Sequence, residues 1–197
     1  VGWVDFESAD APAQIAALAQ NPKLVGLRPM IQDIADDNWM LNPILAPAFE
    51  AMIAHNLTFD ALVLPRHLKN LATLLERHPT LCTVIDHGAK PEIRDGKFDD
   101  WAADMATLAS ETSAYCKLSG IVTEANADWT AADIAPYITH LLSSFGPDRI
   151  IWGSDWPVST LATTYRQWHD VALAFAGADH GKIFGGNAQK AYGLARN

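Results

Sequence analysis

The sequence predicts an α/β fold, an incomplete (β/α)8 barrel of the TIM type with about six of its eight βα units. Apolar, β-forming runs alternate with helical stretches along the chain, and this alternation is typical of a parallel sheet covered by helices. Polar residues follow the expected strands, on the side where such barrels place their chemistry. The 197 residues fall short of the ~250 of a full barrel by about two units.

The strands are expected where apolar, β-forming residues run up to a polar residue or a breaker. Arg28 stands at the end of the second strand, and Pro65 closes the third. The six expected strands are residues 1–6, 23–28, 58–64, 81–86, 114–118 and 149–152.

The helices are expected between the strands, and capping or breaking residues mark their ends. Ser8 or Asp10 is a candidate N-cap for the first helix, which Asn21-Pro22 ends, and Asn187 is one for the last. Leucines at helical spacing mark the third helix. The later helices are expected at residues 42–53, 66–77, 99–110, 130–145, 160–176 and 187–194.

The alternation alone leaves a doubly wound sheet open beside a barrel. A nucleotide-binding sheet of that kind carries a glycine-rich turn between a strand and a helix. Gly185-Gly186 follows no strand and does not complete that fingerprint. The barrel is therefore the favoured prediction, as one domain over residues 1–197.

Composition excludes some partners. The formal charge of −9 disfavours nucleic acid, which needs a basic surface. The sequence contains no run of ~18 apolar residues, so no membrane-spanning helix is predicted. No secretory leader is visible. The two cysteines lack a redox or metal-type spacing. We expect a cytoplasmic protein that binds a small molecule and has no membrane partner. The sequence leaves open whether it forms a homo-oligomer.

The residues 150–157, IIWGSDWP, predict the central catalytic group. A short apolar strand stops at Asp155, and Pro157 prevents further ladder pairing. In a parallel barrel this end of the strand is where catalytic residues lie. Asp155 is therefore predicted to be the acid/base group, although an aspartate can also serve only as a turn residue there.

Three stretches carry a resemblance to a known family. Residues 84–91 (VIDHGAKP), 115–120 (YCKLSG) and 152–157 (WGSDWP) resemble the amidohydrolase superfamily. Within it they are similar to the amidohydrolase-related branch of metal-dependent hydrolases and sugar lactonases, such as the L-fuconolactonase and L-rhamnono-lactonase types. Residues 26–28 and 65–68 strengthen this likeness. It implies a (β/α)8 barrel, and it suggests that the first two strands of that barrel are missing from this chain.

The resemblance also implies a possible metal site, and the sequence departs from it. The family's His-x-His pair on the first strand is absent, and Leu64-Pro65 stands where metal-binding relatives tend to have a histidine. A catalytic zinc needs about three protein ligands, whereas only His87 and Asp155 are well placed. We expect at most one divalent metal, zinc, held by His87 and Asp155, and we expect it not to be essential.

The predicted reaction is hydrolysis of a small sugar lactone. Asp155 is expected to take a proton from water, and His87 is expected to stabilise the oxyanion together with Arg28 or Lys90. Binding roles are also expected for three loop residues, Trp39 and Trp156 on the sugar ring and His67 on a hydroxyl.

Alternatives remain at this stage. The chain can be a metal-dependent amidohydrolase or decarboxylase acting on another small carboxylate, or an inactive barrel fragment that needs a missing segment. Asp86 and Lys117 are expected to be structural rather than reactive. Glu124, in the loop after the fifth expected strand, is the best polar residue without an assigned role.

Overall fold

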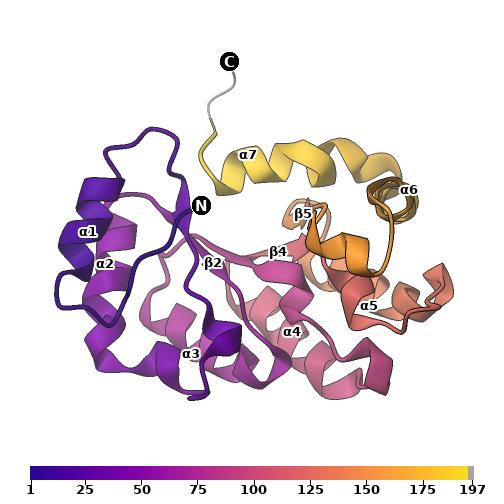
Figure 1. Ribbon diagram of the computed structural model, residues 1–197, viewed down its shortest axis with the longest axis horizontal. Coiled ribbons are helices and arrows are strands. Elements are labelled where there is room, and N and C mark those ends of the chain that lie inside the picture. Colours follow the sequence, from indigo (N-terminus) through magenta and orange to yellow (C-terminus); the bar gives the residue numbers. More distant parts are fainter. Residues whose placement is uncertain (195–197) are drawn as a thin grey trace.

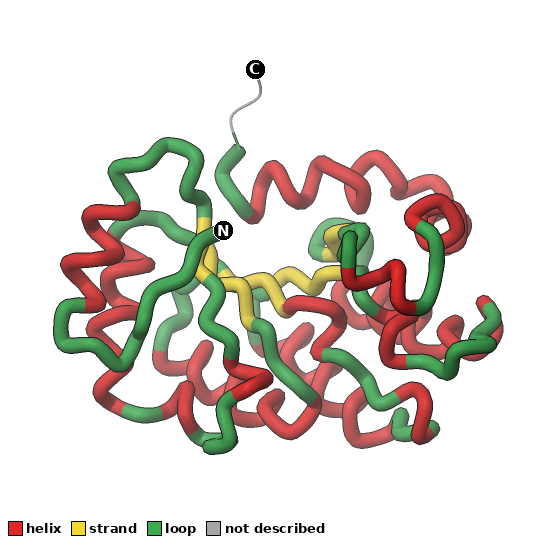
Figure 2. Tube along the Cα trace, in the orientation of Figure 1, coloured by secondary structure: helices red, strands yellow, loops and turns green. Residues whose placement is uncertain are grey.

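The computed structural model describes residues 1–194 and contains an open sheet of five parallel strands. The strands are ordered as they occur in the chain, so each is joined to its neighbour by a crossover that includes at least one helix. Figure 2 shows them as a short band between helices and loops. The strands are β1 (Gly26–Leu27), β2 (Thr58–Ala61), β3 (Thr83–Ile85), β4 (Tyr115–Leu118) and β5 (Ile150–Trp152).

The helices enclose this sheet from two sides. In Figure 1, α3, α4 and α5 lie below the sheet, α1 and α2 lie at its β1 end, and α7 crosses above it. None of the helices within residues 1–194 is long and apolar enough to span a membrane. The helices are α1 (Ala11–Leu18), α2 (Ala46–Ala54), α3 (Leu68–Arg77), α4 (Asp99–Glu111), α5 (Ala131–Phe145), α6 (Tyr165–Ala176) and α7 (Asn187–Ala191).

The prediction of a full strand at residues 1–6 is wrong, because only Gly2 pairs with the sheet. It forms a single parallel bridge with Leu27, in which the Gly2 N–H donates to Gly26 and the Gly2 carbonyl accepts from Arg28. Pro29 follows Arg28 and has no N–H with which to extend the ladder. Six strands were therefore expected, and five strands and one bridge are observed.

Other expected elements are shorter than their apolar patterns suggested. The strand expected at 58–64 ends at Ala61, since the next two N–H groups turn back to carbonyls two residues away. The helix expected from residue 160 begins at Tyr165, after Thr164 accepts a hydrogen bond from the Gln167 N–H. Asn187 makes no N-cap bond; its side-chain amide donates to the carbonyls of Pro147 and Ile150.

The two faces of the sheet pack against different material. Side chains alternate across a strand, so Phe59 and Ile85 point to the helices and join the main hydrophobic core. Val84 and Ile151 point to the other face, where they pack with Ala191 and Tyr192 from the end of the chain. Ala191 and Tyr192 therefore cover part of this second, concave side of the sheet.

A buried charge network occupies that concave side. The Lys117 ammonium donates to the carboxylates of Asp60, at 3.2 Å, and Asp86. The Tyr192 hydroxyl donates to Asp60 at 2.7 Å, and Arg28 lies 3.5 Å from Asp86. Burial, with the nearby Asp86 charge, raises the pKa of Asp60 to about 6, although Lys117 opposes the shift.

Replacement of Lys117 by Met is expected to destabilise the protein in a pH-dependent way. It removes the cation that two buried carboxylates share and leaves Asp60 without a cation, which costs about 3–5 kcal/mol. The folded-state pKa of Asp60 is above its ordinary value, so protonation as the pH falls favours the folded state. The loss measured by urea unfolding should therefore be smaller at about pH 5 than at about pH 7.5.

The matched control for Lys117 is Lys97→Met. Lys97 pairs with Glu92 at 3.0 Å on the surface, where such pairs contribute little. We expect this variant to unfold like the wild type at both pH values. A Lys117→Met protein as stable as the wild type at neutral pH would contradict the structural role of the network.

Candidate active site

Two residues predicted to be catalytic meet at the carboxyl end of the sheet. His87 follows β3 in a tight turn at Asp86–Ala89, and Asp155 follows β5 after Gly153 and Ser154. The imidazole Nε2 lies 3.7 Å from the Asp155 Oδ1. Both side chains are mostly shielded, with exposed fractions of 11% for His87 and 14% for Asp155.

The backbone is left-handed at both residues. His87, Gly88, Ala89 and Lys90 have consecutive φ values of 54°, 56°, 58° and 51°, and Asp155 has a φ of 53°. This region costs a non-glycine residue about 1–2 kcal/mol. The carbonyl of Gly88 accepts a 2.8 Å hydrogen bond from the Trp101 indole, which helps to hold the turn. Such conformations cluster at functional sites, where the surroundings enforce them.

The second nitrogen of the His87 ring, Nδ1, contacts Ser119. Nδ1 lies 2.8 Å from the hydroxyl of Ser119, which follows β4 and is buried. Burial lowers the pKa of His87, and the nearby Asp86 and Asp155 carboxylates only partly oppose this. The neutral imidazole is therefore favoured. Sequence reasoning assigned no role to Ser119; its signal was a polar residue at a strand end.

Two glycines let these groups approach each other. A Cβ on Gly120, whose φ is +63°, would lie 2.8 Å from the His87 Nδ1 and 3.1 Å from the Asp155 Oδ2. A Cβ on Gly153 would lie 3.0 Å from the Ser119 Cβ. The space between the ends of β3, β4 and β5 thus exists because these positions lack side chains.

Cationic groups lie along the same edge of the sheet. Arg28 follows β1 and is 41% exposed while it contacts Asp86. Lys90 ends the left-handed turn and lies 3.8 Å from Glu124. Burial raises the pKa of Glu124, the Asp155 charge adds to the shift, and Lys90 and Arg94 oppose it. Glu124 therefore lies within the electrostatic reach of Asp155.

The structure buries two of the predicted binding residues. Trp39 is 7% exposed and packs against Phe6 in the main core, so its ring face is not offered to a ligand. His67 is fully buried, and its Nδ1 accepts from the Leu64 N–H. Burial lowers the pKa of His67. Both side chains therefore pack inside the protein and stabilise their loops.

Trp156, in contrast, is 67% exposed directly after Asp155. The Trp156 backbone N–H donates to the Ser154 hydroxyl at 3.2 Å, and this bond holds the loop beside the Asp155 carboxylate. Its ring is available to a ligand at this edge.

The donors present do not fit a catalytic zinc. Within the described chain no three His, Cys, Asp or Glu side chains are grouped to hold a metal ion. His87 and Asp155 provide two donors, whereas catalytic zinc commonly takes three protein ligands. No chemical step is therefore derived through a metal.

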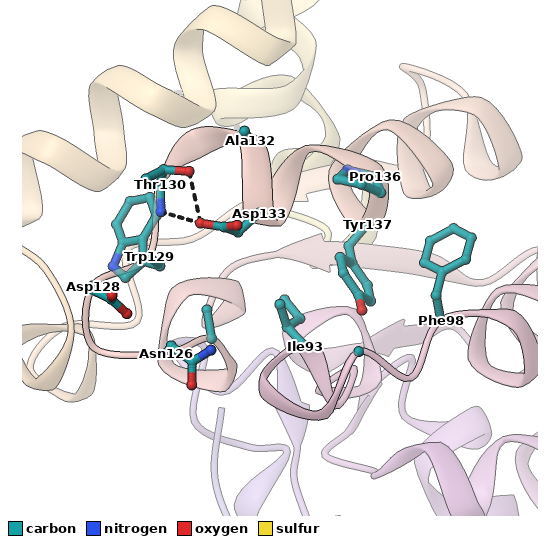
Figure 3. Close-up of a pocket in the computed structure, with 12 residues that line it drawn as sticks. Ile93, Phe98, Asn126, Asp128, Trp129, Thr130, Ala132, Asp133, Pro136 and Tyr137 are labelled. Atoms are coloured by element: carbon teal, nitrogen blue, oxygen red, sulfur yellow. Dashed lines mark hydrogen bonds between the residues drawn. The ribbon is translucent and has the colours of Figure 1, made fainter.

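A surface cavity lies apart from these residues. It has a volume of about 790 Å³ and lies between the start of α5 and the 3-10 turn at Ile93–Asp95. Figure 3 shows Trp129, Asn126 and Asp128 at one end, and Tyr137 and Phe98 at the other. Asp133, on its wall, is already hydrogen-bonded to Thr130. The cavity contains none of the strand-end residues described above.

A parallel α/β sheet with a histidine and an aspartate converging at its carboxyl end has the layout of barrel enzymes, which place their active sites at that end. The chain belongs to the amidohydrolase family, whose pattern matches residues 1–194.

Known relatives agree with this assignment. The chain is 48% identical over 204 residues to L-fucono-1,5-lactonase of Burkholderia ambifaria, covering 100% of this chain and 70% of the relative. It is 32% identical to L-fucono-1,5-lactonase of Burkholderia multivorans, covering 98% and 71%. A crystal structure of an amidohydrolase from Burkholderia multivorans with bound zinc superposes with a TM-score of 0.89 at 31% identity, covering 99% and 73%.

Replacement of Gly120 by Ala is expected to lower the free energy of unfolding by more than the positive φ alone would cause. Gly96 is the matched control, because its φ of +64° is nearly the same and nothing lies within 4 Å of its added Cβ. Gly96→Ala should cost about 1–2 kcal/mol of the free energy of unfolding. Gly120→Ala should cost about 1–3 kcal/mol more, because the methyl group overlaps His87. Equal losses in urea unfolding would contradict the close approach.

Proposed function

We propose that this protein hydrolyses a small sugar lactone to the corresponding sugar acid. The observation that carries the proposal is the 3.7 Å convergence of His87 and Asp155 at the carboxyl end of the sheet, in a chain 48% identical to an L-fucono-1,5-lactonase. That relative's name favours a 1,5-lactone of a six-carbon sugar acid as the first substrate to test. It also favours a lactone over the amide or carboxylate substrates of the alternative functions.

Asp155 acts as the general base in this proposal. Its carboxylate takes a proton from a water molecule, and the water oxygen attacks the lactone carbonyl. The tetrahedral intermediate then collapses, the ester bond breaks, and protonated Asp155 returns the proton to the ring oxygen that leaves. A lactone is a reactive ester, so these reaction steps need no covalent intermediate with the protein.

Hydrogen-bond donors stabilise the oxyanion. His87 is shielded from water and near the carboxylate, so it donates to the carbonyl oxygen as negative charge develops. Arg28, tethered through Asp86, and Lys90, at the end of the left-handed turn, add positive charge at the same edge. Such donors act more strongly in a shielded site because they are already oriented.

Trp156 is proposed to bind the sugar ring. It is exposed and adjacent to Asp155, and an indole ring offers a flat apolar surface with a polar N–H at its edge. Trp39 and His67 receive no role in binding, because both are buried.

Replacement of Asp155 by Asn should abolish most of the activity. The variant retains the shape of the side chain but cannot accept the proton, so kcat should fall by about 10²–10⁴-fold. The measurement is the rate of acid release from L-fucono-1,5-lactone, corrected for spontaneous hydrolysis.

The matched control is Asp148→Asn. Asp148 precedes β5, whereas Asp155 follows it, and Asp148 pairs with Lys182 on the surface. This variant should retain the wild-type rate. Near-normal turnover by a folded Asp155→Asn protein would remove Asp155 from the mechanism.

Chelation of divalent metals should leave turnover unchanged. Residues 1–194 provide only two of the donors that a catalytic zinc would use, so water activation is assigned to Asp155. Metal content is measured before and after dialysis against a chelator, together with kcat. A stoichiometric ion whose removal stops turnover, and whose return restores it, would overturn this part of the proposal.

A further inference from the structure

The hydrogen bond between Ser119 and His87 has two possible directions, and they place the imidazole proton on different nitrogens. The atoms are 2.8 Å apart. If the serine hydroxyl donates, Nδ1 accepts and the neutral ring carries its proton on Nε2. If Nδ1–H donates instead, Nε2 is left with a lone pair that faces Asp155.

The surroundings of Ser119 decide between these directions. The residue is 1% exposed, so its hydroxyl proton has little access to water. Within residues 1–194, the hydroxyl has no hydrogen-bond partner other than His87. If it accepted from Nδ1–H, its own proton would be buried without an acceptor, which is unfavourable. Donation to Nδ1 satisfies both groups.

The position of Asp155 favours the same direction. Its Oδ1 lies 3.7 Å from the His87 Nε2. An N–H on Nε2 points favourably toward the carboxylate, whereas a lone pair there would be repelled by it. This separation is too long for a good hydrogen bond, so the N–H remains available for a ligand oxygen.

We propose that Ser119 is a positioning residue whose hydroxyl donates to the His87 Nδ1 and so keeps the ring proton on Nε2, from which the ring donates to the lactone carbonyl oxygen. The kinetic consequence rests on the proposed lactone hydrolysis, whereas the tautomer itself does not. No proton leaves His87 in this role, because Asp155 both removes the water proton and returns it to the leaving oxygen.

The neighbouring glycines keep the serine in place. A Cβ on Gly153 would lie 3.0 Å from the Ser119 Cβ, and one on Gly120 would lie 2.8 Å from the His87 Nδ1. A side chain at either glycine would therefore displace Ser119 or His87 from their present contact. The end of β4 thus supplies the contact that orients a ring from the end of β3.

The first test is a measurement of the tautomer without substrate. Long-range ¹H–¹⁵N correlation spectra distinguish the two neutral forms of a histidine ring. The chain has seven histidines, and the His87 signals are assigned by their loss in His87→Gln. We expect the wild type to carry its proton on Nε2. A wild-type protein with the proton on Nδ1 overturns the proposal, whatever its activity.

The second test is Ser119→Ala. Without the hydroxyl, the His87 signals should move toward the Nδ1–H form or an average of both forms. Because the donated hydrogen bond strengthens only as the oxyanion develops, kcat should fall about 10-fold or more while KM changes little. A variant that keeps the wild-type tautomer, or the wild-type kcat, overturns the proposal.

Ser159→Ala is the matched control. Ser159 is also buried, but its hydroxyl has no hydrogen-bond partner among the described residues, so the same substitution breaks no such bond. Its tautomer signals and kcat should match the wild type. If the wild-type chain shows the Nε2–H form but hydrolyses no lactone, the proposed substrate fails while the positioning role of Ser119 stands.

Discussion

The buried carboxylate of Asp86 is the constraint on which the site depends. One oxygen contacts the Lys117 ammonium from β4, and the other lies near the Arg28 guanidinium at the end of β1. A buried charge is tolerated only when it is paired in this way. Asp86 also immediately precedes His87, so the pairing that balances the buried charge also anchors the start of the left-handed turn. One side chain therefore links residues at or near the ends of β1, β3 and β4.

Strained backbone at His87 and Asp155 and a glycine at position 120 bring the two side chains together. The left-handed backbone at His87 and Asp155 points both side chains across the end of the sheet, and the missing side chain at Gly120 leaves room for them to meet. This local cost is offset by buried packing and hydrogen bonds around the turn. Groups held in this way are oriented before a ligand arrives, which is the condition under which fixed dipoles stabilise a developing charge.

The same network continues across the face of the sheet that does not pack on the main core. Tyr192 donates to Asp60, and Ala191 packs with Val84 and Ile151 on the concave face. Side chains from β2, β3, β4 and β5 and from residues 191 and 192 thus pack together on this face. Packed side chains also occupy the centre of complete barrels of this kind.

The sequence by itself determined the alternation of strands and helices and the placement of Asp155 and His87 at strand ends, because both follow from local apolar patterns and the breaks that end them. Tertiary structure alone decided which loop residues are exposed. Trp39 and His67 looked suited to binding a sugar, yet packing from distant segments buries them. The contact of Ser119 with His87 joins residues 32 positions apart. No local pattern encodes such a contact, because it depends on how neighbouring strands align.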